Sequence, residues 1–262
     1  MTETPLNMLE KFRLAKKGEI AKLRELAASG GLPPVFDGPR PGFTAMLKQK
    51  PVPVIAEYKR ASPSKGAINL ELTPAVVARA YHEAGAGAMS VLTESTYFKG
   101  ELGFLTAASD VGLPLLRKDF IFHPLQVRHT AATPASAILL IVRCVDDDLL
   151  PRLVAKSVEF GLEPVVEVFD AAELARARRA GAAIIQVNNR DLDRLQVDLD
   201  VSRTLIRERA EGEFWITASG ITSHAELAGM LALGFDAALI GSSLMAGGTP
   251  GDALRRIIGG AP

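Results

Sequence analysis

The fold is decided by a stretch at residues 54–64, which reads VIAEYKRASPS. It begins as a short apolar run, typical of a strand buried on both faces, and then presents a carboxylate, an ammonium group and hydroxyls within a few residues. Side chains two positions apart on a strand point to the same face, so Glu57 and Lys59 are predicted to lie together. Taken alone, this pair fits either a surface ion pair at a strand end or a functional site.

The composition indicates a globular protein with a sizeable core. The chain has 262 residues, of which 48% are hydrophobic and 23% charged, and its formal net charge is zero. A neutral chain gives no support for nucleic-acid binding. No apolar run approaches the roughly 18 to 20 residues of a membrane-spanning helix, and residues 1–22 are mixed and charged rather than an apolar signal segment. We therefore expect a cytoplasmic protein that binds neither nucleic acid nor membrane.

Cysteine and histidine usage gives no sign of a disulfide or a metal site. The one cysteine, Cys144, excludes an internal disulfide. The four histidines are scattered, without the spacing of metal ligands, at positions 82, 123, 129 and 224. No metal is predicted.

Short apolar runs recur along the chain and alternate with helical patterns. The runs are residues 52–57, 88–93, 113–116, 137–142, 164–168, 183–187, 214–217 and 237–240. Such alternation is typical of a parallel sheet, and this many units in a chain of this length fit a (β/α)8 TIM barrel. An open doubly wound sheet is the structural alternative, but it requires a Gly-x-Gly-x-x-Gly turn after the first strand, which the chain lacks.

Start and stop signals bound the helices between these runs. Helices are predicted at 75–84, 147–160, 171–180 and 223–233, opened by Thr73-Pro74, Asp146, Asp170 and Thr222 and ended by Gly85, Gly161, Gly181 and Gly234. A charged amphipathic helix at residues 6–28 and a short helical turn at 43–48 precede the first strand. We expect one barrel domain over residues 1–262, with residues 1–48 as a helical extension packed on it.

Polar residues gather where the predicted strands end. In a barrel of this kind the active site lies at the C-terminal ends of the strands, and these ends carry Glu57 and Lys59, Thr93-Glu94, Arg117-Lys118-Asp119, Glu167, residues 188–191, Ser219-Gly220 and Gly241-Ser242-Ser243. One such residue is most often a solvated loop residue. Several on one rim indicate acid–base chemistry on an anionic substrate.

More specific predictions are possible for the ends of the last two strands and for Lys118. Glycines and hydroxyls at 219–222 and 241–243 leave backbone amides free, which in barrels is a frequent phosphate site. Lys118 follows an apolar run, so it is predicted at the barrel mouth, where a desolvated lysine loses its proton more readily and serves as an acid or in a Schiff base. A plain ion pair of Lys118 with Glu57 or Asp119 is the alternative.

These motifs together resemble the indole-3-glycerol phosphate synthase family. The resemblance rests on IAEYKRASPS at 55–64, SVLTE at 90–94 with YFKG at 97–100, LRKDFI at 116–121, VEV at 166–168, VNNRDL at 187–192, SGI at 219–221 and IGSSL at 240–244. It spans the chain from the first strand to the last. The N-terminal helix is similar to the extra helical segment that precedes the barrel in this family.

The resemblance implies ring closure of 1-(2-carboxyphenylamino)-1-deoxyribulose 5-phosphate to indole-3-glycerol phosphate, with loss of CO2 and water, in tryptophan biosynthesis. It implies no cofactor and no metal, a phosphorylated small molecule as the partner, and a monomer. Lys118 matches the general acid, Glu167 the second acid–base group, and Glu57 and Lys59 an essential carboxylate and a substrate-holding lysine. The implied catalytic set is Glu57, Lys59, Lys118, Glu167, Asn188 and Ser219, and the implied substrate- and phosphate-binding set is Ser62, Arg190, Gly220, Gly241 and Ser242.

Two departures from the family pattern stand out. The family usually has Glu-Ser-Gly-Ile at the seventh strand, where this chain has Ala218 before Ser219. The missing carboxylate puts the rate or the substrate in question. The helical segment after the third strand, residues 124–136, also differs, which we interpret as a change in packing.

Two alternative functions stay open at this point. One is another phosphate-binding barrel, an isomerase or an aldolase. A phosphoribosylanthranilate isomerase would need a cysteine at the end of the first strand, where Glu57 stands, whereas a Schiff-base aldolase could use Lys118. The other is a barrel that binds its ligand with reduced activity because of Ala218.

Overall fold

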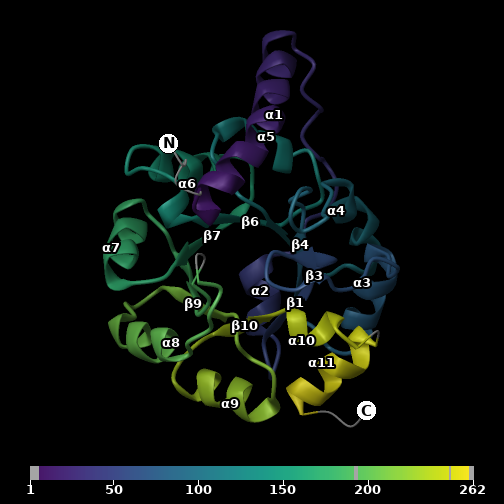
Figure 1. Ribbon diagram of the computed structural model, residues 1–262, viewed down its shortest axis with the longest axis vertical. Coiled ribbons are helices and arrows are strands. Elements are labelled where there is room, and N and C mark those ends of the chain that lie inside the picture. Colours follow the sequence, from purple (N-terminus) through teal and green to yellow (C-terminus); the bar gives the residue numbers. More distant parts are fainter. Residues whose placement is uncertain (1–5, 192–193, 248, 260–262) are drawn as a thin grey trace, which may run out of the picture.

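The computed structural model describes residues 6–191, 194–247 and 249–259. Parallel strands close into a barrel in the order β1-β10-β9-β8-β7-β6-β5-β4. The strands are β1 (Val54–Tyr58), β4 (Ala88–Leu92), β5 (Leu115–Lys118), β6 (Ala137–Ile141), β7 (Glu163–Val168), β8 (Ile184–Asn188), β9 (Phe214–Ala218) and β10 (Ala237–Ile240). The predicted TIM barrel is confirmed, and Figure 1 shows its ring of strands inside a ring of helices.

The predicted strands match the observed ones with small shifts at their ends. The third run was predicted at 113–116, but β5 begins at Leu115 and continues to Lys118. Pro114 has no amide hydrogen, so it contributes only its carbonyl, which accepts from Met89 N. At the other end Lys118 still pairs with Leu92 of β4, which fixes its backbone within the barrel wall.

Helices follow the strands around the outside of the barrel. They are α3 (Pro74–Glu83), α4 (Gly103–Ala107), α5 (Pro124–Thr130), α6 (Leu149–Glu159), α7 (Ala171–Arg179), α8 (Asp200–Leu205), α9 (His224–Ala232), α10 (Ser242–Met245) and α11 (Pro250–Ile258), with single 3-10 turns η1 (Ser109–Val111), η2 (Val142–Cys144) and η3 (Ile206–Glu208). The two-residue strands β2 (Ala61–Ser62) and β3 (Gly66–Ala67) form a small hairpin outside the barrel, after β1.

The predicted helix starts and ends are confirmed in part. Thr73 and Asp170 cap α3 and α7, and the four glycines predicted to end helices all have positive φ. The start of α9 was wrong by one residue, because Ser223 rather than Thr222 forms the capping box with Glu226. Helix α6 starts two residues later than predicted, since Asp146 accepts from the amide of Leu149 and so closes a turn before the helix.

The two N-terminal helices cover opposite ends of the barrel. Helix α1 (Met8–Ala28) packs on α5 and projects beyond it at the top of Figure 1. Helix α2 (Phe43–Lys48) lies over the middle of the strand ring, where the amides of Phe43 and Thr44 bond the carboxylate of Glu163 at the start of β7. Helix α2 therefore closes the N-terminal end of the barrel, which leaves the C-terminal end for a site. The assignment of residues 1–262 to one domain stays a prediction.

Candidate active site

Two adjoining cavities open at the C-terminal ends of the strands. The first lies among the ends of β1, β4, β5, β6, β7 and β8, as expected for the site of a barrel of this kind. Both cavities are lined by Glu57, Lys59, Lys118, Arg190, Ser219 and Ser242. The first also contains Ser62, Glu167 and Asn188, and the second Gly220 and Gly241. The structure thus brings together every residue that the sequence assigned to the site.

A carboxylate shared by two lysines lies where the cavities meet, and we call Lys59, Glu57 and Lys118 the inner triad. Lys59 Nζ lies 2.6 Å from Glu57 Oε1, and Lys118 Nζ lies 3.1 Å from Glu57 Oε2. Glu57 is on β1 and Lys118 on β5, with β4 between them, so both side chains reach inward across one strand. The predicted proximity of Glu57 and Lys59 is confirmed.

The charges of the inner triad shift the pKa values of its members. Burial alone would raise the pKa of Glu57, but Lys118 and Lys59 outweigh it and hold this pKa at about 2. Burial lowers the pKa of Lys59, against the opposing charge of Glu57. Burial also acts to lower the pKa of Lys118, but Glu57 and Glu167 outweigh it and the pKa is raised.

The raised pKa of Lys118 corrects one expectation from the sequence. Burial was predicted to make this lysine lose its proton more readily, whereas its raised pKa keeps the ammonium charged. The ion pair with Glu57 is the reason, and a pair with Asp119, the other partner considered, does not form among the described residues. A charged lysine can donate a proton, but a Schiff base needs the neutral amine. The geometry therefore favours a general acid at Lys118.

The cavity is completed on its far side by Glu167 of β7 and Asn188 of β8. Glu167 is buried, and its Oε2 accepts from Gln186 Nε2 at 2.5 Å. Asn188 Oδ1 accepts from the backbone amide of Arg190, while Arg190 Nη1 donates to the carbonyl of Leu195. Asn188 and Arg190 are thus held by the loop that follows β8.

Glycine is required at two positions of the second cavity. A Cβ at Gly241 would lie 2.2 Å from Glu57 Oε1, so only glycine lets this carboxylate occupy its place. Gly220 has φ +94°, and a Cβ there would lie 2.5 Å from Val197. Thr222 and Ser243, from the two stretches predicted to bind phosphate, also line this cavity, and so does Lys65, which the sequence analysis did not assign to the site. Ammonium, hydroxyl and glycine backbone groups suit a phosphate.

Ser62 was predicted with the phosphate-binding set but lies in the first cavity. Its hydroxyl is 3.4 Å from that of Ser64 and accepts from the amide of Lys65. Ser62 therefore orients the turn from which Lys65 reaches the second cavity.

An apolar wall lines the first cavity and was not foreseen. It consists of Phe12, Leu92, Phe98, Phe120, Leu139 and Ile141. Phe12 of α1 stacks on Phe120 with ring centroids 3.8 Å apart. The alternation along β4 and β6 could have pointed to Leu92 and Ile141. Phe12 had no such signal, because it lies far from the strand ends in sequence.

Several other polar residues at the strand ends hold the surrounding backbone. Glu94 accepts from the amides of Thr96, Tyr97 and Phe98 and thereby holds a loop. Asn189 donates to Thr217 Oγ1 and to two carbonyls at the end of β9. Asp191 bonds the backbone of Arg194 and Gln196.

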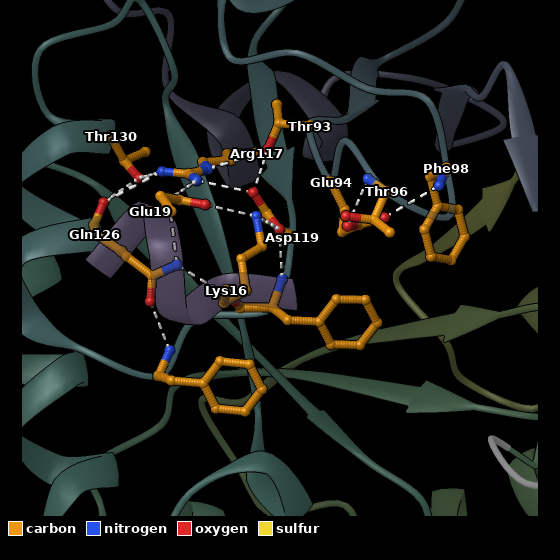
Figure 2. A network of polar contacts seen from close by, with 12 residues as sticks. Lys16, Glu19, Thr93, Glu94, Thr96, Phe98, Arg117, Asp119, Gln126 and Thr130 are labelled. Atoms are coloured by element: carbon orange, nitrogen blue, oxygen red, sulfur yellow. Dashed lines mark hydrogen bonds and ion pairs between the residues drawn. The ribbon is translucent and has the colours of Figure 1, made fainter. Parts of the chain in front are cut away.

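Arg117 and Asp119 belong to a second network, between β5 and α1, shown in Figure 2, and Asp119 also lines the first cavity. Asp119 binds Lys16 Nζ at 2.6 Å and Arg117 Nη2 at 2.8 Å, and Glu19 lies 3.2 Å from Arg117 Nη2. Hydrogen bonds to this network come from Thr93, Gln126 and Thr130. We call Lys16, Glu19, Arg117 and Asp119 with these three residues the outer cluster.

Ala218 ends β9 beside Asn188 and is buried. No group of three or more side chains able to hold a metal ion occurs in the described ranges. No helix within them is long and apolar enough to cross a membrane.

Comparisons with known proteins give the family. Residues 9–257 match the family model described as indole-3-glycerol phosphate synthase. The chain is 39% identical over 263 residues to the indole-3-glycerol phosphate synthase of Exiguobacterium sibiricum, covering 97% of this chain and 98% of the relative. It is 43% identical over 209 residues to that of Aquifex aeolicus, covering 79% and 81%.

Solved structures agree on the fold. The 3-hexulose-6-phosphate synthase of Salmonella typhimurium superposes with a TM-score of 0.64 at 15% identity, over 78% of this chain and 96% of the other. At that identity the likeness shows the barrel alone. From its family model and its relatives, the chain belongs to the indole-3-glycerol phosphate synthase family.

Proposed function

We propose that this chain closes the indole ring of indole-3-glycerol phosphate from 1-(2-carboxyphenylamino)-1-deoxyribulose 5-phosphate, using the two cavities as one site. The observation that carries the proposal is the inner triad, which lies between an apolar wall and a glycine- and hydroxyl-rich cavity. The substrate has the same three parts: an aromatic ring with a carboxylate, a ketone with hydroxyls, and a phosphate.

The two cavities bind the ends of the substrate. The aryl ring packs on Phe12, Phe98 and Phe120, and the phosphate binds at Gly220, Gly241 and Ser242. The ring carboxylate pairs with Lys59, whose ammonium already contacts Glu57. Asn188 and Arg190 orient the substrate hydroxyls, and Ser219 lies where both cavities meet.

Lys118 acts in the first step. The ring carbon that carries the carboxylate attacks the ketone carbon, and the ketone oxygen takes a proton from the Lys118 ammonium. Glu57 keeps that ammonium charged in the free site. Loss of CO2 then restores the aromatic ring, and its electron pair returns to the ring.

Glu167 acts when water leaves. The new hydroxyl departs with a donated proton, for which Lys59 and Lys118 are both in place, and the neighbouring CH2 group gives up a proton to Glu167. The products are indole-3-glycerol phosphate, CO2 and water. One proton is taken up from solvent in each turnover, because the ionised ring carboxylate leaves as neutral CO2, and this proton and the one held by Glu167 restore the two lysines. A carboxylate and two ammonium groups around one cavity supply both directions of proton transfer.

The test follows indole fluorescence in time when the purified protein meets the carboxyphenylamino substrate. Product should form with the wild type and with Lys156→Ala, an exposed lysine on α6, and should fall by at least about 100-fold with Lys118→Ala. Tight binding without product would favour the ligand-binding alternative. Trapping of a substrate adduct on Lys118 by borohydride would favour the Schiff-base alternative.

The proposal includes a cytoplasmic monomer whose partner is this phosphorylated substrate. Light scattering on the purified protein checks the oligomeric state, with a mass near 27.9 kDa expected for the monomer.

A further inference from the structure

Gln186 is a polar residue inside the barrel that the mechanism above does not use. It lies on β8 within an apolar run, and its side chain is wholly buried. It stands two positions before Asn188, so both side chains point into the barrel, with Gln186 one layer deeper than the cavity.

The register of the sheet places Gln186 against Glu167. The two residues are direct partners between β8 and β7, and paired residues of parallel strands project to the same side. Gln186 Nε2 donates to Glu167 Oε2 at 2.5 Å. An ionised carboxylate has no donor and only accepts hydrogen bonds. The NH2 group of the Gln186 amide must therefore be the one that faces Glu167.

Glu167 differs from the other carboxylates that line the first cavity. Glu57 is held by Lys59 and Lys118, and Asp119 by Lys16 and Arg117. In the described part of the chain Glu167 has no ion pair within 4 Å.

The charged and titratable groups that face Glu167 act on it from further away. They are Lys118 from β5, with Glu57 of β1 behind it, Cys144 after β6, and Arg190 after β8. The amide of Gln186 is the short-range contact that favours an ionised Glu167, because a buried carboxylate needs hydrogen bonds from donors.

The amide at position 186 carries a cost that an apolar side chain would not. Gln186 Oε1 is buried and finds no hydrogen-bond partner among the described residues. An unpaired buried carbonyl costs about 1–3 kcal/mol. The neighbours on its strand and the next, Ile184 and Ile216, are aliphatic. Stability alone therefore does not account for a glutamine here.

We propose that Gln186 is a positioning residue that keeps Glu167 ionised and aimed into the cavity as the base for water expulsion. The inference rests on the proposed function of Glu167. It adds a residue that never touches the substrate but sets the protonation and direction of one that does.

The test compares Gln186→Met, which keeps the length and loses the donor, with the wild type and with Ser157→Ala. Ser157 is a buried hydroxyl on α6 whose bond to the carbonyl of Leu153 lies away from the cavity. In Gln186→Met we expect kcat to fall about tenfold with KM within about twofold, since a hydrogen bond to a charged group is lost. The loss of the bond to the Glu167 carboxylate and the removal of the unpaired carbonyl act on stability in opposite directions, so only a small change in melting temperature is expected.

A second readout does not need turnover. The side-chain carboxyl carbon of Glu167, assigned by its loss in Glu167→Gln, is followed by 13C NMR as a function of pH. In Gln186→Met its titration midpoint should move upward, because a donor to the ionised carboxylate is lost, and in Ser157→Ala it should not move. Gln186→Glu should lose activity more steeply than the wild type as pH rises, because its donor proton is then lost.

The outcomes separate this inference from the proposed function. A wild type that makes no product overturns the proposed function, while the NMR titration still decides whether Gln186 controls Glu167. An active wild type with unchanged kcat and an unmoved midpoint in Gln186→Met overturns the inference alone. A lower melting temperature with an unmoved midpoint would show that Gln186 serves only packing, and would likewise overturn it.

Discussion

Arg117 and Lys118 are neighbours on β5, both largely buried, but they enter two charge clusters of different character. Arg117 points outward into the outer cluster, beneath α1, as Figure 2 shows. Lys118 points inward to the inner triad and the cavity. Alternation along one strand thus separates the two clusters by a single residue.

In the outer cluster the charges are balanced and the hydrogen-bond donors have acceptors. Lys16 and Arg117 balance Glu19 and Asp119, and Asp119 accepts from Lys16, Arg117, Thr93 and the amide of Phe120. With its charges balanced and its donors matched by acceptors, such a network can fix α1 on the barrel but has little left for a ligand.

In the inner triad the charges are not balanced. Its two ammonium groups share one carboxylate, which leaves a net positive charge beside an empty cavity. Lys118 Nζ contacts Glu57 Oε2 at 3.1 Å, and since an ammonium group has three donors, others remain for a substrate. The comparison teaches that burial of charge does not mark the active site in this molecule. What marks it is charge left unmatched beside a cavity.

The largest effect on activity should come from removing the negative charge of the inner triad. Glu57→Gln removes the carboxylate that pairs with both lysines, which then repel each other, and we expect kcat/KM to fall about 1000-fold. The assay is indole fluorescence. The same change at the other end of the barrel, Glu163→Gln, should leave kcat/KM within about threefold because its side chain bonds Phe43 and Thr44 of α2, away from the two cavities. Equal losses in both variants would contradict the distinction.

The pH dependence of the free energy of unfolding should reveal the ionisation of Glu57. Glu57 has a pKa of about 2 in the folded protein against a usual 4.5, so its ionisation stabilises the fold above pH 4.5 and this contribution is lost as pH falls toward 2. The stability difference between the wild type and Glu57→Gln should therefore shrink by about 3 kcal/mol between about pH 5 and 2. Urea denaturation at several pH values measures it, and shifts of the other carboxylates cancel in the difference. A difference that is constant or grows on acidification would be inconsistent with the inner triad.

The smallest effect should come from restoring the carboxylate missing from β9. Since Glu57 already neutralises one lysine charge, Ala218→Glu should change kcat by less than about tenfold and raise KM a few-fold, because it adds negative charge near an anionic substrate. Ala218→Gln, of the same size without the charge, is the control. A gain in kcat well above tenfold in the glutamate variant alone would mean that Ala218 limits turnover.

The barrel was predictable from sequence because its signals are local. Strands buried on both faces read as apolar runs, and glycines with positive φ mark the helix ends, as at Gly161 and Gly234. The catalytic and binding residues were predictable because most of them lie at or just after the end of such a run, as Glu57 and Lys118 do, and their roles came from the resemblance to the family.

The partners of those residues were not predictable. Glu19 and Arg117 are 98 positions apart, so the helical pattern of α1 gives a buried face but not what it meets. For the same reason Phe12 gave no sign that it lines the cavity. Gln186 did carry a visible signal, a lone amide in an apolar run, whose meaning needed the register with β7.

The most direct test of the account makes one change at each of two adjacent positions, Arg117→Met and Lys118→Met, and measures both urea stability and turnover for each. Arg117→Met should lower the free energy of unfolding by about 3–5 kcal/mol, since it leaves buried carboxylates unpaired, and should keep kcat within about tenfold while folded. Lys118→Met should lower the free energy of unfolding by less than Arg117→Met does, because Lys59 still pairs with Glu57, and should reduce kcat by at least about 100-fold. If the two variants lost stability and activity in the same proportion, the division into a balanced structural cluster and an unbalanced reactive one would be wrong.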